Sequence, residues 1–187
     1  TTISTYEAED ESGNTTACSF DITVSDEEAP VFDCPEDISL PTDLGVCTAT
    51  YTFTNPSATD NCSEGLVVTQ TEGPPSGTDL PVGTTTFTFE TADEAGNVST
   101  CSYTVTVSDN EPPIFSECPE SIEIQLAPNA CDTAVVFDTP IATDNCEFIL
   151  VQTAGPQSGE VLSVGTYAVE FTATDNAGNT GLCQFDI

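Results

Sequence analysis

The chain has 187 residues, of which 32 are aspartate or glutamate, and it contains no lysine, arginine or histidine, so its formal net charge is −32. Nucleic acid and anionic membrane surfaces are excluded as partners, because no side chain could neutralise a phosphate. Catalysis by a histidine base, a Ser-His-Asp relay or a Schiff-base lysine is excluded as well, so we expect a protein that is not an enzyme.

The chain repeats itself with a period of 82 to 84 residues, which is typical of a tandem array. The repeating cysteines fall in three series: Cys34 and Cys118; Cys47 and Cys131; Cys62 and Cys146. A fourth series has three members: Cys18, Cys101 and Cys183. Such regularity favours a folded chain, although high net charge alone would favour disorder.

Two similar segments, SDEEAPVFDCP at 25–35 and SDNEPPIFSECP at 108–119, join the copies. Proline fixes φ and removes a hydrogen-bond donor, so each joint should be a stiff, extended connector outside a sheet interior. The sequence therefore predicts three domains. Residues 1–25 are the C-terminal part of a first module, 26–108 are a complete module, and 109–187 are a third module lacking its last residues. No apolar run is long enough to insert directly into a membrane.

Short strands are predicted in order along the complete module: 38–41, 47–53, 66–71, 85–89 and 101–107. The strand at 47–53 alternates between threonine and apolar residues, which is the period of a half-buried strand. The third module repeats these faces, beginning with Ile122, Ile124 and Leu126. Because no segment has helical periodicity, we expect an all-β chain of tandem immunoglobulin-like antiparallel β-sandwich modules in a linear array.

The nine cysteines indicate an oxidising, extracellular or cell-surface location and a disulfide framework. Four cysteines in each module allow three pairings, and the sequence alone does not choose among them. Metal-binding CxxC pairs are absent, which argues against zinc. Cys18 belongs to the truncated first module, so we expect its partner to lie upstream.

The order of motifs in the complete module is CP, GVC, ATDNC, PVGTTTFTF and ADEAGN followed by TC. The third module has CP, NAC, ATDNC, SVGTYAVEF, ATDNAGN and LC. This combination resembles the hyalin repeat (HYR) module. The resemblance implies an immunoglobulin-like fold and an adhesive role in extracellular tandem arrays. Such arrays are found in animal matrix and adhesion proteins and in cell-surface adhesins of Bacteroidetes-type bacteria.

The immunoglobulin-like topology also implies a disulfide pairing. It puts Cys34 near Cys101, and Cys118 near Cys183, and family members that keep only two cysteines resemble this pair. The remaining cysteines would then pair within their modules, as Cys47–Cys62 and Cys131–Cys146.

The same topology brings three acidic segments to one end of each module: the incoming joint, the ATDN loop and the turn before the last strand. Their oxygens suit Ca²⁺, which we expect to hold successive modules at a fixed angle. The candidate ligands share an oxygen-bearing side chain: Asp26, Glu28, Asp60, Asn61, Asp93, Asn97, Asp109, Glu111, Asp144, Asn145, Asp175 and Asn179. Alternatively, Asp60 and Asp93 are ordinary Asx-turn residues, with Gly96 at positive φ.

These features favour a structural spacer in an extracellular stalk or filament, with neighbouring modules of the same chain as partners and like chains in a fibre as further candidates. The alternative is an adhesion module that recognises a glycan or a protein through exposed loops such as 73–79. Three sequons, at Asn14, Asn61 and Asn97, match the N-glycosylation pattern of eukaryotic secreted proteins.

Overall fold

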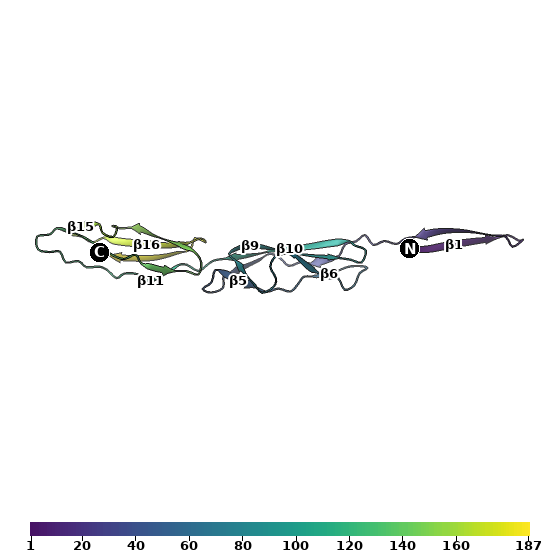
Figure 1. Cartoon of the computed structure of the whole chain (residues 1–187), viewed down its shortest axis with the longest axis horizontal. Helices are drawn as coiled ribbons and strands as arrows, with labels where there is room; N and C mark the ends of the chain where they lie inside the picture. The colour runs from purple at the N-terminus through teal and green to yellow at the C-terminus, as the bar shows by residue number, and fades with distance from the viewer. The chain divides into compact units, whose positions relative to one another are not determined.

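The structure is a computed structural model that describes residues 1–187. Figure 1 shows a chain of strands and loops without a helix, which confirms the predicted all-β class. Residues group into two compact units. Unit 1 comprises Thr1–Glu36, Thr54–Gly73 and Phe87–Tyr103, and unit 2 comprises Asp37–Phe53, Pro74–Thr86 and Thr104–Ile187. The boundary between the units crosses the two longest strands, β9 (Gly83–Ala92) and β10 (Val98–Ser108).

Unit 1 begins with a hairpin in which β1 (Thr2–Glu9) pairs antiparallel with β2 (Thr15–Ile22). Its apolar side chains are exposed, Phe20 to 48%. The counterpart of Phe20 in the complete repeat is Tyr103, of which only 3% is exposed. The hairpin therefore presents the strand face that the complete repeat buries.

The rest of unit 1 contains parts of the hydrogen-bonded strands β9 and β10 and two further pairs, which are antiparallel. One joins β3 (Val31–Asp33) to β6 (Ser57–Thr59), and the other joins β7 (Thr69–Glu72) to β9. The joint thus continues after Pro30 as a short strand in a two-stranded sheet, while the residues before Pro30 stay outside any strand. Proline is tolerated just before a strand because its missing N–H breaks no ladder there.

In unit 2, the chain that follows Cys34 and Pro35 forms β4 (Ile38–Pro41), which pairs in parallel with the end of β10. This is the exception among the antiparallel pairs described here. The next strand, β5 (Thr48–Tyr51), pairs antiparallel with β8 (Thr78–Pro81). The period of two is visible in β5, since Ala49 is buried and Thr50 is exposed. Sequence analysis missed β6 and β8, because their sequences, SAT and TDLP, lack the alternating apolar residues that Ile38 and Leu40 give to β4.

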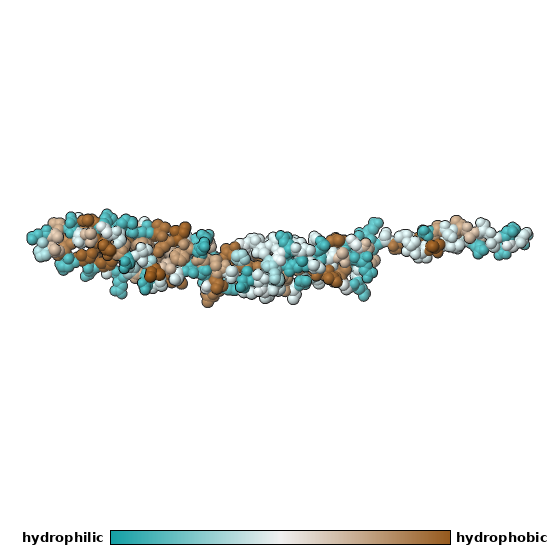
Figure 2. Space-filling view, viewed as in Figure 1, coloured by the Kyte–Doolittle hydropathy of each residue, from teal (hydrophilic) through white to brown (hydrophobic).

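The C-terminal repeat lies wholly in unit 2. A three-stranded antiparallel sheet has the order β14 (Phe148–Ala154), β16 (Ala168–Asp175) and β17 (Thr180–Asp186). Two shorter antiparallel pairs are β11 (Ile114–Glu117) with β13 (Ile141–Thr143), and β12 (Asp132–Ala134) with β15 (Val161–Ser163). The core packs alternating residues of these strands and of the segment after β12: Val135, Phe137, Leu162, Val169, Phe171, Cys183 and Phe185. Figure 2 shows hydrophobic patches that remain on the surface of this repeat.

The predicted strand through Ile122, Ile124 and Leu126 does not form, and the segment is irregular apart from a hydrogen bond from the Ile122 N–H to the Asp186 carbonyl. In the complete repeat, β4 pairs with residues 105–108 of β10. Ile187 corresponds to Val105, so the segment lacks the strand residues with which β4 pairs. A strand without its ladder leaves backbone groups unpaired, which explains the difference.

We expect Phe171→Ala to lower the free energy of unfolding of the C-terminal repeat by about 3–5 kcal/mol, because it removes a ring packed between Phe137 and Phe185. Chemical denaturation followed by tyrosine fluorescence measures the change. The matched control is Phe20→Ala on the exposed face of β2, which should have a much smaller effect. Equal losses in both variants would contradict the assignment of the core.

Candidate functional site

The structure gathers the predicted aspartates into two clusters, one in each unit: Asp26 with Asp60 and Asp93, and Asp109 with Asp144 and Asp175. Within a cluster, one carboxylate oxygen of each residue lies within 4.8 Å of those of the other two. Three negative groups this close repel one another strongly unless a cation neutralises them or a proton binds. Each cluster thus has the spacing at which three carboxylates can share one ion.

Turns position the aspartates of the first cluster. Asp60 accepts hydrogen bonds from the N–H groups of Cys62 at 3.0 Å and Ser63 at 2.8 Å. Asp93 accepts one from the Asn97 N–H at 2.7 Å, in a turn that Gly96 completes at φ 94°. These are Asx-type turns, as the structural alternative predicts. They do not exclude an ion, because each carboxylate oxygen has two lone pairs and the turns use only some of them.

Several side-chain oxygens around the clusters are buried and have no hydrogen-bond partner: Asp26 Oδ2, Asp60 Oδ1, Asp109 Oδ2 and Asn145 Oδ1. Asp109 as a whole is only 5% exposed. A buried carboxylate oxygen without a partner is costly, since it has lost its water and gained nothing in exchange. A divalent cation would satisfy these atoms. The donor set consists of hard oxygens, so it fits Ca²⁺ rather than a metal that prefers nitrogen or sulfur.

In each cluster, one asparagine side chain is hydrogen-bonded both to the incoming joint and to the aspartate of the turn before the last strand. The Asn97 amide donates to the backbone carbonyls of Asp26 and Glu28, both at 3.2 Å, and to Asp93 Oδ2 at 2.7 Å. Asn179 makes the same three contacts in the second cluster, to Asp109, Glu111 and Asp175. Both predicted ligands therefore act here through their NH₂ groups, which position the aspartates of the cluster.

The remaining predicted ligands lie beside the clusters. Glu28 accepts a hydrogen bond from the Asn61 amide at 2.6 Å, and Glu111 accepts one from the Gly45 N–H at 3.1 Å. Asn145 donates to Asp109 Oδ1 at 3.1 Å and to the Val46 carbonyl at 3.3 Å. The loop 42–46 thus contacts the second cluster. Sequence analysis missed this role because the loop makes its contacts mainly through backbone groups.

The pKa values of the aspartates respond to this packing. Burial opposes ionisation of Asp93 and Asp175. Hydrogen bonds from Asn97 and Asn179, together with those from the backbone N–H groups of the same turns, outweigh it, so the pKa of each carboxyl lies below its usual value. Burial raises the pKa of Asp144, and the nearby charges of Asp109 and Asp175 raise it further against the opposing backbone hydrogen bonds. A bound cation would counteract the repulsion that raises it.

Three disulfides are present. Cys34–Cys101 and Cys118–Cys183 are the pairs that the immunoglobulin-like topology implies. The third, Cys47–Cys146, replaces the expected Cys47–Cys62 and Cys131–Cys146 pairs and spans 99 residues.

The correction has a structural cause. The loop that ends at Cys47 is hydrogen-bonded to Asn145 and Glu111, which brings the Cα atoms of Cys47 and Cys146 within 4.8 Å. Cys18, Cys62 and Cys131 are free and exposed.

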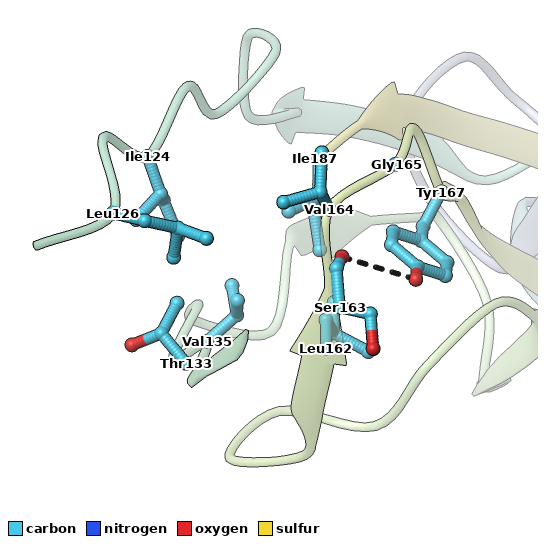
Figure 3. A pocket seen from close by; sticks show the side chains of 10 residues that line it. All are labelled: Ile124, Leu126, Thr133, Val135, Leu162, Ser163, Val164, Gly165, Tyr167 and Ile187. Carbon is cyan, nitrogen blue, oxygen red and sulfur yellow. Dashed lines mark hydrogen bonds between the residues drawn. The ribbon is translucent and has the colours of Figure 1, made fainter. Parts of the chain in front are cut away.

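A cavity of about 120 Å³ opens in the C-terminal repeat, with Ile124, Leu126 and Leu162 among its apolar lining (Figure 3). In the complete repeat, the counterpart of Ile124 is Leu40, which pairs with the buried Val107. The chain has no counterpart of Val107 in its last repeat. The lining is therefore a strand-packing surface, and we assign no ligand to it.

The fold and the site define a disulfide-linked protein made of tandem β-sandwich repeats. The HYR domain family matches residues 25–107 and 108–187, and the chain belongs to this family. Its family and its three disulfides are those of an extracellular or cell-surface protein. The structure has no helix that could span a membrane.

Curated relatives agree with this family. Over its whole length the chain is 33% identical to hyalin of Lytechinus variegatus and 31% identical to hyalin of Strongylocentrotus purpuratus. Over 87% of its length it is 32% identical to the rat protein named sushi, von Willebrand factor type A, EGF and pentraxin domain-containing protein 1. The chain spans 36%, 16% and 4% of these three proteins, respectively.

Solved structures with a similar course of the chain are cadherin ectodomains. The protocadherin gammaB4 extracellular domain is 16% identical, with a TM-score of 0.41. The match covers 98% of this chain and 41% of that structure's chain. Drosophila N-cadherin EC1-4 is 14% identical, with a TM-score of 0.37. The match covers 98% of this chain and 56% of that structure's chain.

We expect Asn179→Ala to lower the free energy of unfolding by about 1–3 kcal/mol, because it removes the side-chain donor to Asp175 Oδ2 and to the part-buried carbonyls of Asp109 and Glu111. The low pKa of Asp175 in the folded state contributes stability that is present above the unfolded pKa and is lost as pH falls through the folded pKa. The variant should raise that folded pKa, so its acid unfolding should begin at a higher pH.

Acid titration followed by circular dichroism measures the effect of Asn179→Ala. Asn176→Ala is the matched control, because Asn176 lies in the same turn and is exposed. An identical acid transition in the two variants would show that the Asn179 hydrogen bonds contribute nothing.

Proposed function

We propose that the chain is a spacer segment of an extracellular stalk or filament, in which modules 26–108 and 109–187 are linked by a disulfide and stiffened by Ca²⁺ at their joint. One observation carries the proposal: buried, unpartnered carboxylate oxygens gather at equivalent places in a chain without any basic side chain. Family membership supports the extracellular setting and the tandem arrangement.

The ligand set of the second cluster supports calcium. Asp109, Asp144 and Asp175 offer carboxylate oxygens, and Asn145 adds an unpartnered amide oxygen. Ca²⁺ takes six to eight oxygens in a flexible geometry, so backbone carbonyls and water would complete the shell. When bound there, the ion supplies positive charge that allows the carboxylates to stay ionised together.

The contacts around Asp109 link the ion to the joint. Asp109 Oδ1 accepts hydrogen bonds from the Thr42 hydroxyl at 3.5 Å and from the Asn145 amide at 3.1 Å. Thr42 belongs to the first matched segment, and Asn145 belongs to the second. An ion that fixes the Asp109 carboxylate would therefore also fix the contact between the two modules. This coupling is what a spacer requires, since the joints of a repeat array set its stiffness.

The second candidate is an adhesion module that binds a glycan or a protein. Its support is the loop 73–79, whose residues are mostly exposed but which is hydrogen-bonded to the chain at residues 51 and 53. The Ser76 hydroxyl donates to the Phe53 carbonyl at 2.7 Å, and the Gly77 N–H donates to the Tyr51 carbonyl at 2.8 Å. A loop fixed before binding loses less entropy on binding. Immobilised-glycan binding that is abolished by substitutions in this loop would favour this candidate.

We expect isothermal titration of the calcium-free chain with CaCl₂ to show two binding sites. We also expect millimolar Ca²⁺ to raise the melting temperature, because a ligand at 100 times its Kd stabilises the folded state by about 2.7 kcal/mol. Asp109→Asn should remove one of the two sites. The control Asp132→Asn changes an exposed aspartate of β12 outside both clusters and should retain two sites.

Two outcomes would contradict the calcium proposal. One is the absence of binding heat and of any melting shift between EDTA and millimolar Ca²⁺. The other is an equal loss of binding in Asp109→Asn and Asp132→Asn, which would indicate diffuse counterion attraction to the surface charge instead of a site.

A further inference from the structure

The Cys47–Cys146 disulfide joins one repeat to the next. Cys47 lies in the first matched segment and Cys146 in the second, whereas Cys34–Cys101 and Cys118–Cys183 each lie within one segment. It sits where the loop 42–46 contacts the acidic cluster of the following repeat. This disulfide is therefore an inter-repeat staple, defined here as the bond between the GVC-loop cysteine of one repeat and the ATDNC cysteine of the next.

The loop that ends at Cys131 has the same backbone conformation as the loop that ends at Cys47. In the first loop, the Val46 N–H donates to the Asp43 carbonyl at 3.1 Å, and Gly45 has φ 75°. In the second loop, the Ala130 N–H donates to the Ala127 carbonyl at 3.0 Å, and Asn129 has φ 69°. Positive φ at a residue other than glycine is uncommon, so the shared turn is a specific feature. Cys131 is thus presented as Cys47 is, but it is free and exposed.

The local backbone hydrogen bonding at Cys62 matches that at Cys146. In both, an aspartate two residues earlier accepts a hydrogen bond from the cysteine N–H, through Asp60 Oδ2 at 3.0 Å and through Asp144 Oδ2 at 3.3 Å. The neighbouring asparagines differ. The Asn145 amide reaches the Val46 carbonyl of the preceding repeat, whereas Asn61 donates to Glu28 in its own repeat. The surroundings of Cys62 therefore lack the loop that Cys146 contacts.

From these two matches we infer that the staple recurs at every joint of this repeat. Cys62 bonds to a GVC-type cysteine of a repeat placed before it, and Cys131 bonds to an ATDNC-type cysteine of a repeat placed after it. The partner in each case is another copy of this module. The inference rests on the tandem arrangement of the proposed function and does not depend on calcium.

The same register accounts for Cys18, the third free cysteine. Cys18 is the counterpart of Cys101 and Cys183, each of which bonds to the cysteine at the start of its own repeat. The three free thiols thus have one explanation. Each forms a disulfide whose second cysteine belongs to a repeat outside residues 26–187.

Formation of the staple is an ordinary thiol oxidation. Two cysteine thiols lose two protons and two electrons and form one S–S bond. Oxidised glutathione is a suitable oxidant, because its own disulfide takes up the electrons and protons and leaves as two molecules of reduced glutathione.

The test extends the whole chain by one repeat. Residues 106–187 are added again after Ile187, which continues the register because Ile187 corresponds to Val105. In the added copy, Cys131→Ser removes the additional GVC-type thiol. The exposed Val151→Ile changes the mass of the peptide that contains the added copy's Cys146, so that the two copies of Cys146 can be told apart. The protein is oxidised with glutathione and treated with an alkylating agent. It is then cleaved on the N-terminal side of aspartate, which keeps Cys146 and Val151 in one peptide, 144–174, since trypsin has no lysine or arginine to recognise.

Non-reducing mass spectrometry should find Cys131 joined to the marked Cys146 and Cys47 joined to the unmarked one. In the unextended chain, Cys131 should be alkylated. Alkylation of Cys131 in the extended chain, or its bonding to Cys18 or Cys62, would overturn the inference, provided that the Cys34–Cys101 and Cys118–Cys183 bonds show that the protein has folded. The map should be the same in Ca²⁺ and in EDTA, so a failure of the calcium proposal would be distinguishable from a failure of the staple.

Discussion

Repulsion among three carboxylates held close together is the constraint on which the rest of this structure depends. Each cluster contains three pairs of like-charged groups, with one carboxylate oxygen of each residue within 4.8 Å of those of the other two, and like charges this close disfavour one another's ionisation. The chain has no basic side chain to reduce this cost. Asparagine hydrogen bonds and Asx turns hold the aspartates in place but supply no net charge, so the proposed function assigns their neutralisation to a bound ion. Divalent cations are the natural choice because the oxygens are hard ligands.

The location of the second cluster would give the proposed ion a mechanical consequence. Asp109 stands at the start of the C-terminal repeat and accepts a hydrogen bond from Thr42 of the repeat before it. The Cys47–Cys146 disulfide is next to this contact. In the proposed calcium-bound form, covalent and ionic restraints would act on the same joint: the disulfide limits how far the two segments can separate, and the ion would order the groups between them. A small β-sandwich with a modest core would gain stability from both.

The sequence predicted those features that depend on local patterns or on one repeat alone. Alternation identified the inward residues of β5, β9 and β10, and the spacing of turns grouped the aspartates. The missed features depend on contacts across repeats. Cys47 and Cys146 are 99 residues apart, and their approach is set by backbone contacts of a loop, which leave no residue pattern. The strand expected at 122–126 did not form because residues 1–187 do not include counterparts of 106–108, with which most of β4 pairs in the complete repeat.

The most direct measurement of the central claim is an anomalous difference map from crystals grown in Ca²⁺ and soaked with a lanthanide ion, which occupies calcium sites and scatters anomalously. The account predicts one peak at Asp26, Asp60 and Asp93 and another at Asp109, Asp144 and Asp175, each within coordination distance of the carboxylate oxygens. Well-ordered aspartates with no anomalous peak between them would contradict it.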